Sequence, residues 1–351
     1  MTLWTDFLSA RGALFDGETV VSFGDAGAEL AAAGDHAVVC DLAALGVLRV
    51  AGTDAAAFLQ GQLTNDVMAL APDASQYAAW CSPKGRMLAN FVVRRVDDDS
   101  FELLVHAALA ATIRKRMGMF VLRSKVTIDD ASAATVRLGI GGRDAASVVR
   151  EMFGALPVLH RLALTPAASV LALPRGRFVA FVPPQSAPAL WERLSSRARP
   201  SGFPVWQWLT IRAGVPVISP ATADQFVPQA ANMDALDAVS FRKGCYTGQE
   251  IVARTQYLGR MKERLILAHV DGLPPPPGAR LYSPVFDAQA CGSIVNAAPA
   301  PGGGSDLLAV LQLAAKDSGE VHADAPDGRR LALLQLPYSL PDAAPPRGRT
   351  A

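Results

Sequence analysis

Short apolar runs separated by turn residues fill the first third of the chain, and this pattern predicts strands mixed with helices. The run 47–50 predicts a strand that leads into a helix from Asp54, with Thr53 as the N-cap. The runs 77–82 and 87–96 predict the two strands of a β-hairpin. Pro-Lys-Gly-Arg between them suits a turn, because proline fits the first corner and glycine a positive φ.

A strand at 101–105 and a helix at 107–120 complete the first unit. The pattern then repeats and predicts a second unit of the same kind, with a strand at 136–139, a helix at 144–153, strands at 169–173 and 177–182, and a helix at 187–197. Strands and helices are mixed without the regular alternation of a parallel βαβ protein. The fold class predicted is therefore α+β.

The last part of the chain has a different pattern. Four consecutive prolines precede Gly278, and short strand-like runs with Gly and Pro turns follow, which predict a small β-barrel or sandwich. The end of the chain is rich in Pro, Ala and Arg and has nothing to bury, so we expect it to be disordered. The predicted organisation is an α+β domain at 1–130, a second at 131–265, a β-barrel at 266–340 and a tail at 341–351.

Composition and charge limit the function classes. The 351 residues are 50% hydrophobic, which fits a globular protein of two or three domains. The 33 basic and 32 acidic side chains nearly cancel, so we expect neither direct nucleic-acid binding nor membrane binding. The first residues lack a basic region followed by an apolar run, and no stretch reaches roughly 18 apolar residues. We therefore expect a cytoplasmic protein.

The four cysteines are scattered, and a reducing cytoplasm keeps such cysteines as thiols. No Cys-x-x-Cys pair occurs, and no histidine lies three to five residues from a cysteine or another histidine. The spacing of zinc ligands is thus missing, and we expect no metal site. The cysteines expected to be buried packing residues are Cys40, Cys81 and Cys291.

The fourth cysteine lies in the most informative segment of the chain. Thr247 and Glu250 fit a capping box, which predicts a helix that begins at Gly248. Cys245 precedes this helix start and follows Arg242 and a lysine, and both the helix start and the cations favour thiolate over thiol. Cys245 is therefore the candidate reactive or cluster-contacting sulfur.

Simpler interpretations apply to the same residues. A cysteine is commonly a small buried hydrophobe, and Lys243 and Arg254 could be solvated surface cations. Gly244 and Gly248 indicate a loop rather than a ligand site. Elsewhere, Gly-Ile-Gly-Gly-Arg-Asp resembles the start of a dinucleotide fingerprint, but Asp144 takes the position of its third glycine and disfavours a nucleotide.

The eight residues 243–250, Lys-Gly-Cys-Tyr-Thr-Gly-Gln-Glu, resemble the signature of the YgfZ branch of the folate-binding YgfZ/GcvT superfamily. The similarity extends to Phe-Leu-Gln-Gly-Gln-Leu-Thr-Asn-Asp at 58–66 and to the hairpin turn Ser-Pro-Lys-Gly-Arg at 82–86. Matching the signature implies a functional role for Lys243 and Cys245 as candidate catalytic residues. The accompanying signature residues are Arg242, Gly244, Tyr246, Thr247, Gly248, Gln249, Glu250 and Arg254.

The resemblance implies an aminomethyltransferase-like fold, with two α+β domains and a C-terminal β-barrel in a ring around a channel. It implies that the channel binds tetrahydrofolate or a one-carbon derivative and that the signature loop faces the channel. It further implies partners among iron–sulfur client or assembly proteins, including an enzyme that methylthiolates tRNA. The residues that match positions of the folate pocket are Gln62, Asp66, Tyr77 and Asn90.

The chain also departs from the aminomethyltransferases of the glycine cleavage system. They carry an acidic pair after the equivalent hairpin, where this chain has Ala89 and Asn90, and an amide cannot shuttle a proton as a carboxylate does. They also carry Tyr-Thr-Gly-Glu where this chain reads Leu-Thr-Pro-Ala-Ala from Leu164.

Three hypotheses remain open. The first is a tetrahydrofolate-binding protein that assists iron–sulfur cluster assembly or repair and supports tRNA modification indirectly, without being a conventional enzyme. The alternative is a folate-dependent one-carbon transferase of the aminomethyl type. A third is a scaffold that uses neither folate nor its thiol.

Overall fold

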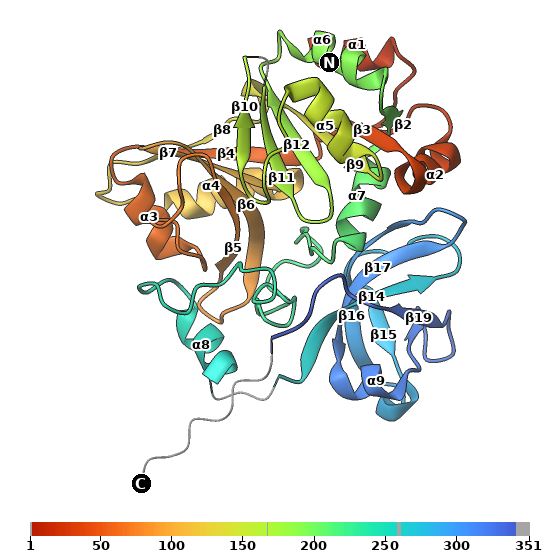
Figure 1. Cartoon of the computed structure of the whole chain (residues 1–351). Helices are drawn as coiled ribbons and strands as arrows, with labels where there is room; N and C mark the ends of the chain where they lie inside the picture. The colour runs from red at the N-terminus through yellow and green to blue at the C-terminus, as the bar shows by residue number, and fades with distance from the viewer. Residues whose placement is uncertain (1, 167, 258–260, 342–351) are drawn as a thin grey trace.

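The computed structural model describes residues 2–166, 168–257 and 261–341, and most of its strands form three sheets. Figure 1 shows the first unit on the left, the second at the top and the third at the lower right. Only Pro341 of the predicted disordered tail belongs to the described residues. None of the helices in these ranges is both long and apolar enough to cross a membrane.

The first unit contains a five-stranded antiparallel sheet in the order β5-β6-β7-β4-β8. The predicted hairpin, the strand that follows it and the next helix are all confirmed. Helices α3 and α4 pack against the sheet. The elements are β4 (Leu45–Ala51), α3 (Ala55–Gln62), β5 (Ser75–Cys81), β6 (Met87–Asp97), β7 (Ser100–His106), α4 (Ala107–Gly118) and β8 (Thr127–Asp130).

Two local details of this unit test the turn and cap predictions. Gly85 has φ +68° in the turn between β5 and β6, as the pattern predicts. The N-cap of α3 is Asp54 rather than Thr53. The Asp54 carboxylate accepts a hydrogen bond from the backbone N–H of Lys125 at 2.7 Å, so this residue joins two segments instead of capping its own helix with its side chain.

The second unit contains a six-stranded sheet in the order β10-β11-β12-β9-β3-β13. The predicted strands and helices between residues 136 and 197 are confirmed within a few residues. Its strands are β3 (Ala37–Asp41), β9 (Val136–Gly142), β10 (Leu162–Leu164), β11 (Ser169–Leu173), β12 (Arg177–Val182) and β13 (Arg199–Ser201). Its helices are α1 (Leu3–Ser9), α2 (Ala26–Asp35), α5 (Ala145–Phe153), α6 (Ala187–Ser195) and α7 (Phe203–Arg212), and a small hairpin is formed by β1 (Leu14–Asp16) and β2 (Thr19–Ser22).

The beginning of the chain packs with this second unit. Strand β3 lies between β9 and β13, antiparallel to the first and parallel to the second. Leu8, Val20 and Val39 share one hydrophobic core with Trp191 of α6. The predicted boundary at residue 130 therefore does not separate the two sheets. Residues up to 41, which precede this boundary, form a strand of the second sheet or pack into its core.

The third unit is a curled six-stranded antiparallel sheet in the order β18-β15-β16-β17-β14-β19, at the place of the predicted barrel. One face of the sheet buries a compact apolar core. Its elements are β14 (Glu263–Val270), β15 (Arg280–Tyr282), β16 (Ala290–Pro299), β17 (Ser305–Gln312), α9 (Leu313–Ser318), β18 (His322–Ala323) and β19 (Leu331–Leu334).

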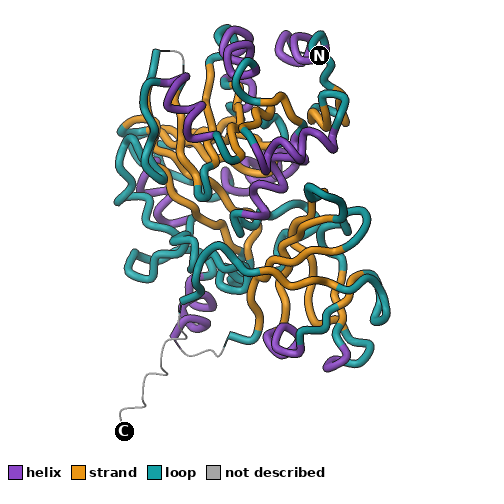
Figure 2. The backbone as a smooth tube through the Cα atoms, turned by 45° about the vertical axis from the view of Figure 1, so that its right-hand side comes forward, coloured by secondary structure: helices purple, strands orange, loops and turns teal. Residues whose placement is uncertain are grey.

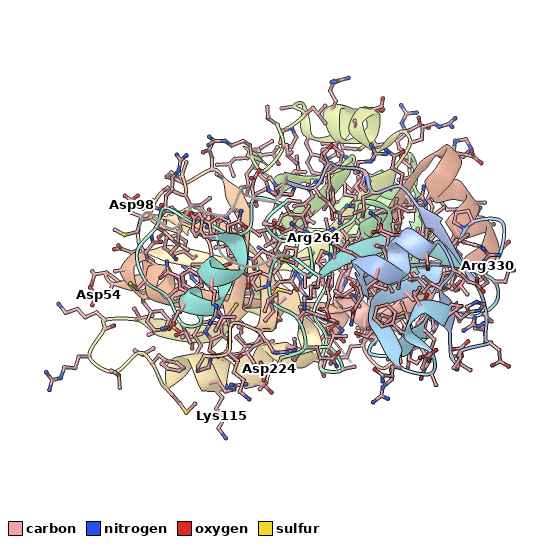
Figure 3. All side chains as sticks on the ribbon, turned by 90° about the horizontal axis from the view of Figure 1, so that it is seen from below. Asp54, Asp98, Lys115, Asp224, Arg264 and Arg330 are labelled. Atoms are coloured by element: carbon pink, nitrogen blue, oxygen red, sulfur yellow. The ribbon has the colours of Figure 1, made fainter. Side chains whose placement is uncertain are left out.

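A long segment without helix or strand, residues 213–248, connects α7 to α8 (Gln249–Tyr257). Figure 1 shows it in green to teal below the first unit, in a region that Figure 2 draws as loop. Many of its side chains are buried in the hydrophobic core that also contains residues of the first and third sheets. Arg264 of β14, near the middle of the molecule in Figure 3, pairs with Asp234 of this segment at 2.7 Å, and both side chains are less than a tenth exposed. The segment therefore fixes both the signature and the third unit relative to the first.

Candidate functional site

The residues with candidate chemistry collect in two regions. We call residues 242–248, which lead into α8, the signature loop. The second region is an internal cavity between the units, which we call the central cavity. The signature loop is built from two buried anchors with an exposed thiol between them.

Lys243 is the first anchor, with only 8% of the residue exposed. Its Nζ donates to the backbone carbonyl oxygens of Gln60, Leu63 and Asn65 at 2.6, 2.6 and 2.9 Å. These carbonyls lie at the C-terminal end of α3, where a helix leaves carbonyls without internal partners and favours a cation. Burial lowers the pKa of Lys243 to about 8, and Asp66 opposes this effect. Lys243 therefore ties the loop to the first unit.

Tyr246 is the second anchor, with 7% exposed. Burial raises the pKa of its hydroxyl, and the nearby Cys81 adds to that effect. The Lys243 ammonium lies 5.2 Å from the centre of the Tyr246 ring, so the two anchors also attract each other. Cys245 stands between them and is exposed, as is Gly244. The loop thus presents its thiol to solvent from a fixed base.

The other three cysteines are buried, as predicted. Burial raises the pKa of Cys81 to about 12 and that of Cys291 to about 11, and it raises the pKa of Cys40 further. Because the thiolate is the reactive form, these three thiols are inert packing groups in the folded protein.

The end of the signature packs against the turn of the β5–β6 hairpin. Gly248 has φ +84°, and a Cβ atom there would lie 2.5 Å from the backbone oxygen of Ser82. The helix begins at Gln249, so Gly248 stands outside it. The predicted capping box, with Thr247 as cap and a helix from Gly248, is therefore wrong by one residue, because the close approach to the hairpin requires a left-handed glycine at this position.

The remaining signature side chains lie at or near the surface. Arg242, Glu250 and Arg254 are exposed, whereas Thr247 and Gln249 are half-buried. Of the two cations that precede Cys245 in the sequence, only Arg242 therefore reaches solvent near the loop surface, while the lysine points into the first unit.

Two of the four predicted pocket residues lie close to the lysine anchor and not in the central cavity. The Gln62 side-chain oxygen accepts a hydrogen bond from the Trp80 indole at 3.2 Å. The Asp66 carboxylate accepts one from the Gln60 amide at 3.0 Å. Both side chains thus support the loop that follows α3.

The other two, Tyr77 and Asn90, line the central cavity. The Asn90 amide is occupied at both ends: its Nδ2 donates to the Pro216 carbonyl and its Oδ1 accepts from the Ile218 N–H, each at 2.8 Å. Asn90 therefore holds the connecting segment in place. The Tyr77 hydroxyl makes no hydrogen bond within the described residues.

The central cavity has a volume of about 130 Å³ and mostly apolar walls, and the described residues around it include no carboxylate. It lies between β5–β7 of the first unit, β11, β12 and α7 of the second, and β16 of the third. No residue of the signature loop is among those that line it. The walls include Tyr77, Phe91, Leu104, Val179, Phe203, Trp206, Val215 and Ala297.

Arg177 carries the fixed charge of the cavity and was not among the predicted site residues. It is 2% exposed and donates to the Pro174 carbonyl and the Thr210 hydroxyl at 3.1 and 3.0 Å. Its remaining Nη2 has no hydrogen-bond partner in the described part of the chain. One signal in the sequence could have found it, because Arg177 is the charged residue that opens an otherwise apolar strand, 177–182.

A family model and a solved structure agree on the fold of this chain. Residues 10–165 match the family model of the GCVT N-terminal domain. The structure resembles the glycine cleavage system aminomethyltransferase T of Bartonella henselae, with a TM-score of 0.76, 18% identity, and coverage of 95% of this chain and 96% of that one. This confirms the predicted aminomethyltransferase-like α+β fold.

Two sequence relatives are more similar. The tRNA-modifying protein YgfZ of Sodalis glossinidius is 33% identical over 297 residues, which cover 82% of this chain and 89% of that protein. The protein of the same name from Escherichia coli K12 is 32% identical over 297 residues, covering 83% and 90%.

Proposed function

The chain belongs to the YgfZ family, and from this premise we propose that it binds a tetrahydrofolate in the central cavity and assists iron–sulfur cluster assembly or repair in client enzymes. Its support of tRNA modification would then be indirect, through a client that modifies tRNA. The observation that carries the proposal is the position of Cys245: it is the exposed cysteine of the described chain, on a loop anchored by Lys243 and Tyr246. A protein partner can reach this thiol without unfolding anything.

The central cavity fits one end of a folate in chemical character, because its volume of about 130 Å³ is smaller than the roughly 300 Å³ or more of a pocket for a whole ligand of this kind. Phe203, Trp206 and Tyr77 give it aromatic walls for a flat ring, and such contacts favour stacked or edge-on arrangements. Within the described residues, Arg177 Nη2 and the Tyr77 hydroxyl have no hydrogen-bond partner of ordinary geometry, which suits a ligand that brings its own oxygen acceptors. When bound, a tetrahydrofolate supplies the capacity to carry one-carbon units.

The separation of thiol and cavity shapes the proposed mechanism. The cavity is lined by residues of three units, whereas Cys245 lies on the surface before α8. A bound folate would therefore contact the protein core, whereas the thiol would contact the client protein. Small folate-dependent changes could reach the loop through the connecting segment, because Asn90 and Asp234 hold that segment between the two regions.

The alternative of a one-carbon transferase gains no support from the cavity. Proton transfer in such chemistry needs a positioned acid or base, and a carboxylate is the usual group besides histidine. The described lining has no carboxylate, and burial lowers the pKa of His106, its one histidine. We expect no transfer of formaldehyde equivalents to tetrahydrofolate by the purified protein, and robust turnover in that assay would favour the transferase instead.

Complementation of a bacterium that lacks its own YgfZ-family gene tests the proposal. We expect Cys245→Ala to fold and to bind tetrahydrofolate like the wild type but to lose rescue of iron–sulfur enzyme activities. Cys291→Ala, which removes a buried thiol, is the matched control and should rescue. Full rescue by Cys245→Ala would remove the thiol from the mechanism, and failure of the wild type to bind tetrahydrofolate in isothermal titration would remove the folate.

A further inference from the structure

Arg177 is a buried cation without a counter-ion. No carboxylate forms an ion pair with it among the described residues, and its guanidinium lies 5.6 Å from the centre of the Trp206 ring. Two of its nitrogens are satisfied by Pro174 and Thr210, and Nη2 is not. A buried charge without a partner is costly, and proteins keep one where it meets a ligand or a special structural need.

Tyr77 is the second unsatisfied group at the same place. It is 3% exposed and lies close enough to Arg177 for a weak hydrogen bond between the two side chains, one outside ordinary geometry. Burial raises the pKa of the Tyr77 hydroxyl more than Arg177 lowers it, so the hydroxyl stays protonated at neutral pH. It can therefore donate its proton to an acceptor.

The two asparagines and the threonine of the cavity wall are already occupied. Asn296 exchanges two hydrogen bonds of 2.8 Å with the backbone of Val217, and Asn90 is saturated in the same way. Thr210 donates to the Trp206 carbonyl while it accepts from Arg177. The buried donors of the described cavity lining that still lack an acceptor therefore belong to Arg177 and Tyr77.

We propose that Arg177 and Tyr77 form a subsite that holds an electron-rich oxygen of the folate inside the central cavity. This inference rests on the proposed binding of a folate there. The oxygen can come from the carbonyl of the pterin ring or from a carboxylate of the glutamate tail, and both offer what the two donors lack. The subsite selects against a ligand that would place a cation or an N–H group at this depth, because either would face Arg177 without an acceptor.

Substitution of Arg177 separates recognition from structure. We expect Arg177→Met to weaken tetrahydrofolate binding about 10- to 100-fold, the range for a lost hydrogen bond to a charged group. The same variant should keep or raise the melting temperature, because replacing an unpaired buried charge by an apolar side chain is neutral or stabilising. Arg94→Met is the matched control: Arg94 is also buried, but it pairs with Glu102 at 2.6 Å, and neither residue lines the cavity. It should lower the melting temperature and leave binding unchanged below that temperature.

Tyr77→Phe provides a test that does not depend on how Arg177→Met folds. It removes one donor while keeping the ring, and we expect about 3- to 10-fold weaker binding with an unchanged melting temperature. Titration with a tetrahydropterin that lacks the tail and with p-aminobenzoylglutamate identifies the oxygen, since only the fragment that carries it should lose affinity in the Arg177 and Tyr77 variants.

The outcomes are distinct for the two proposals. Wild-type affinity in both Arg177→Met and Tyr77→Phe overturns the subsite and leaves the folate proposal standing. A wild-type protein that binds no tetrahydrofolate overturns the folate proposal, and the subsite with it.

Discussion

The signature loop and the central cavity each contain one buried cation. The two cations differ in how many of their N–H donors have a hydrogen-bond partner. Lys243 donates to three backbone carbonyls within 2.9 Å. Arg177 keeps one nitrogen without a partner beside an equally unpartnered Tyr77 hydroxyl. A saturated buried cation has no donor left for a ligand, whereas an unsaturated one that faces a cavity keeps a donor that a ligand can use.

This difference assigns different roles to residues that look alike in the sequence. The resemblance gave Lys243 a functional role, and its ammonium reaches carbonyls of the first unit, so we infer that it positions the loop rather than contacting a ligand. Arg177 belongs to no motif of the sequence, and it lines the central cavity. The loop therefore displays Cys245, and the cavity keeps two donors that the proposed folate would use.

The largest expected effect concerns the exposure of the loop. We expect alkylation of Cys245 in the native protein to be at least about a thousand times faster than that of the other cysteines, because buried amides and thiols react only through opening of the fold. Mass spectrometry of peptides after timed iodoacetamide treatment measures the four rates. In denaturant, the four cysteines should react alike.

Modification of Cys81 at a rate near that of Cys245 would contradict this contrast. It would mean that the hairpin end beside Tyr246 opens together with the loop, because Cys81 lies next to Tyr246 and is 1% exposed.

The second prediction compares Lys243 with Arg177. Lys243→Met leaves three buried carbonyls without their donor, and we expect a loss of about 2–4 kcal/mol in the free energy of unfolding. Tetrahydrofolate affinity should stay unchanged at temperatures where the variant is folded, the reverse of the pattern expected for Arg177→Met. Urea denaturation and titration calorimetry measure the two quantities.

Lys84→Met, at an exposed lysine of the hairpin turn, is the control and should change neither quantity. If Lys243→Met is as stable as the wild type, the lysine does not anchor the loop.

The smallest effect is the pH dependence of the lysine anchor. The folded-state pKa of Lys243 is about 8, below its ordinary value of 10.5. Between these values the unfolded chain holds a proton that the folded chain has released, so stability rises with pH over this range and is flat below it. We expect the wild type to gain about 2 kcal/mol at most relative to Lys243→Met between pH 8 and pH 10. Parallel denaturation curves at several pH values measure this difference.

A fall of the wild type relative to the variant over the same range would contradict the lowered pKa. It would show that the three carbonyls hold the ammonium more strongly than burial opposes it.

Local patterns were sufficient for much of the fold. The hairpin of β5 and β6, with its turn glycine, and the helices α4, α5 and α6 follow from apolar periodicity and turn chemistry, which act between residues close in sequence. The burial of three cysteines and the exposure of the fourth also agree with residue chemistry. The start of α8 differed by one residue, because the contact of Gly248 with Ser82 lies outside the local pattern.

The sequence by itself thus determined the α+β class, the family and the segment that carries the thiol, since motifs and periodicity are properties of neighbouring residues. Only the tertiary structure decided that β3 joins the second sheet, that Lys243 reaches the end of α3, and that Arg177 meets Tyr77 in a cavity without carboxylates. Each of these depends on segments about 95 to 180 residues apart in the chain, as the pairing of Lys243 with Leu63 illustrates. Whether a buried polar group is satisfied depends on such distant partners, so the distinction between an anchor and a recognition residue exists only in the folded molecule.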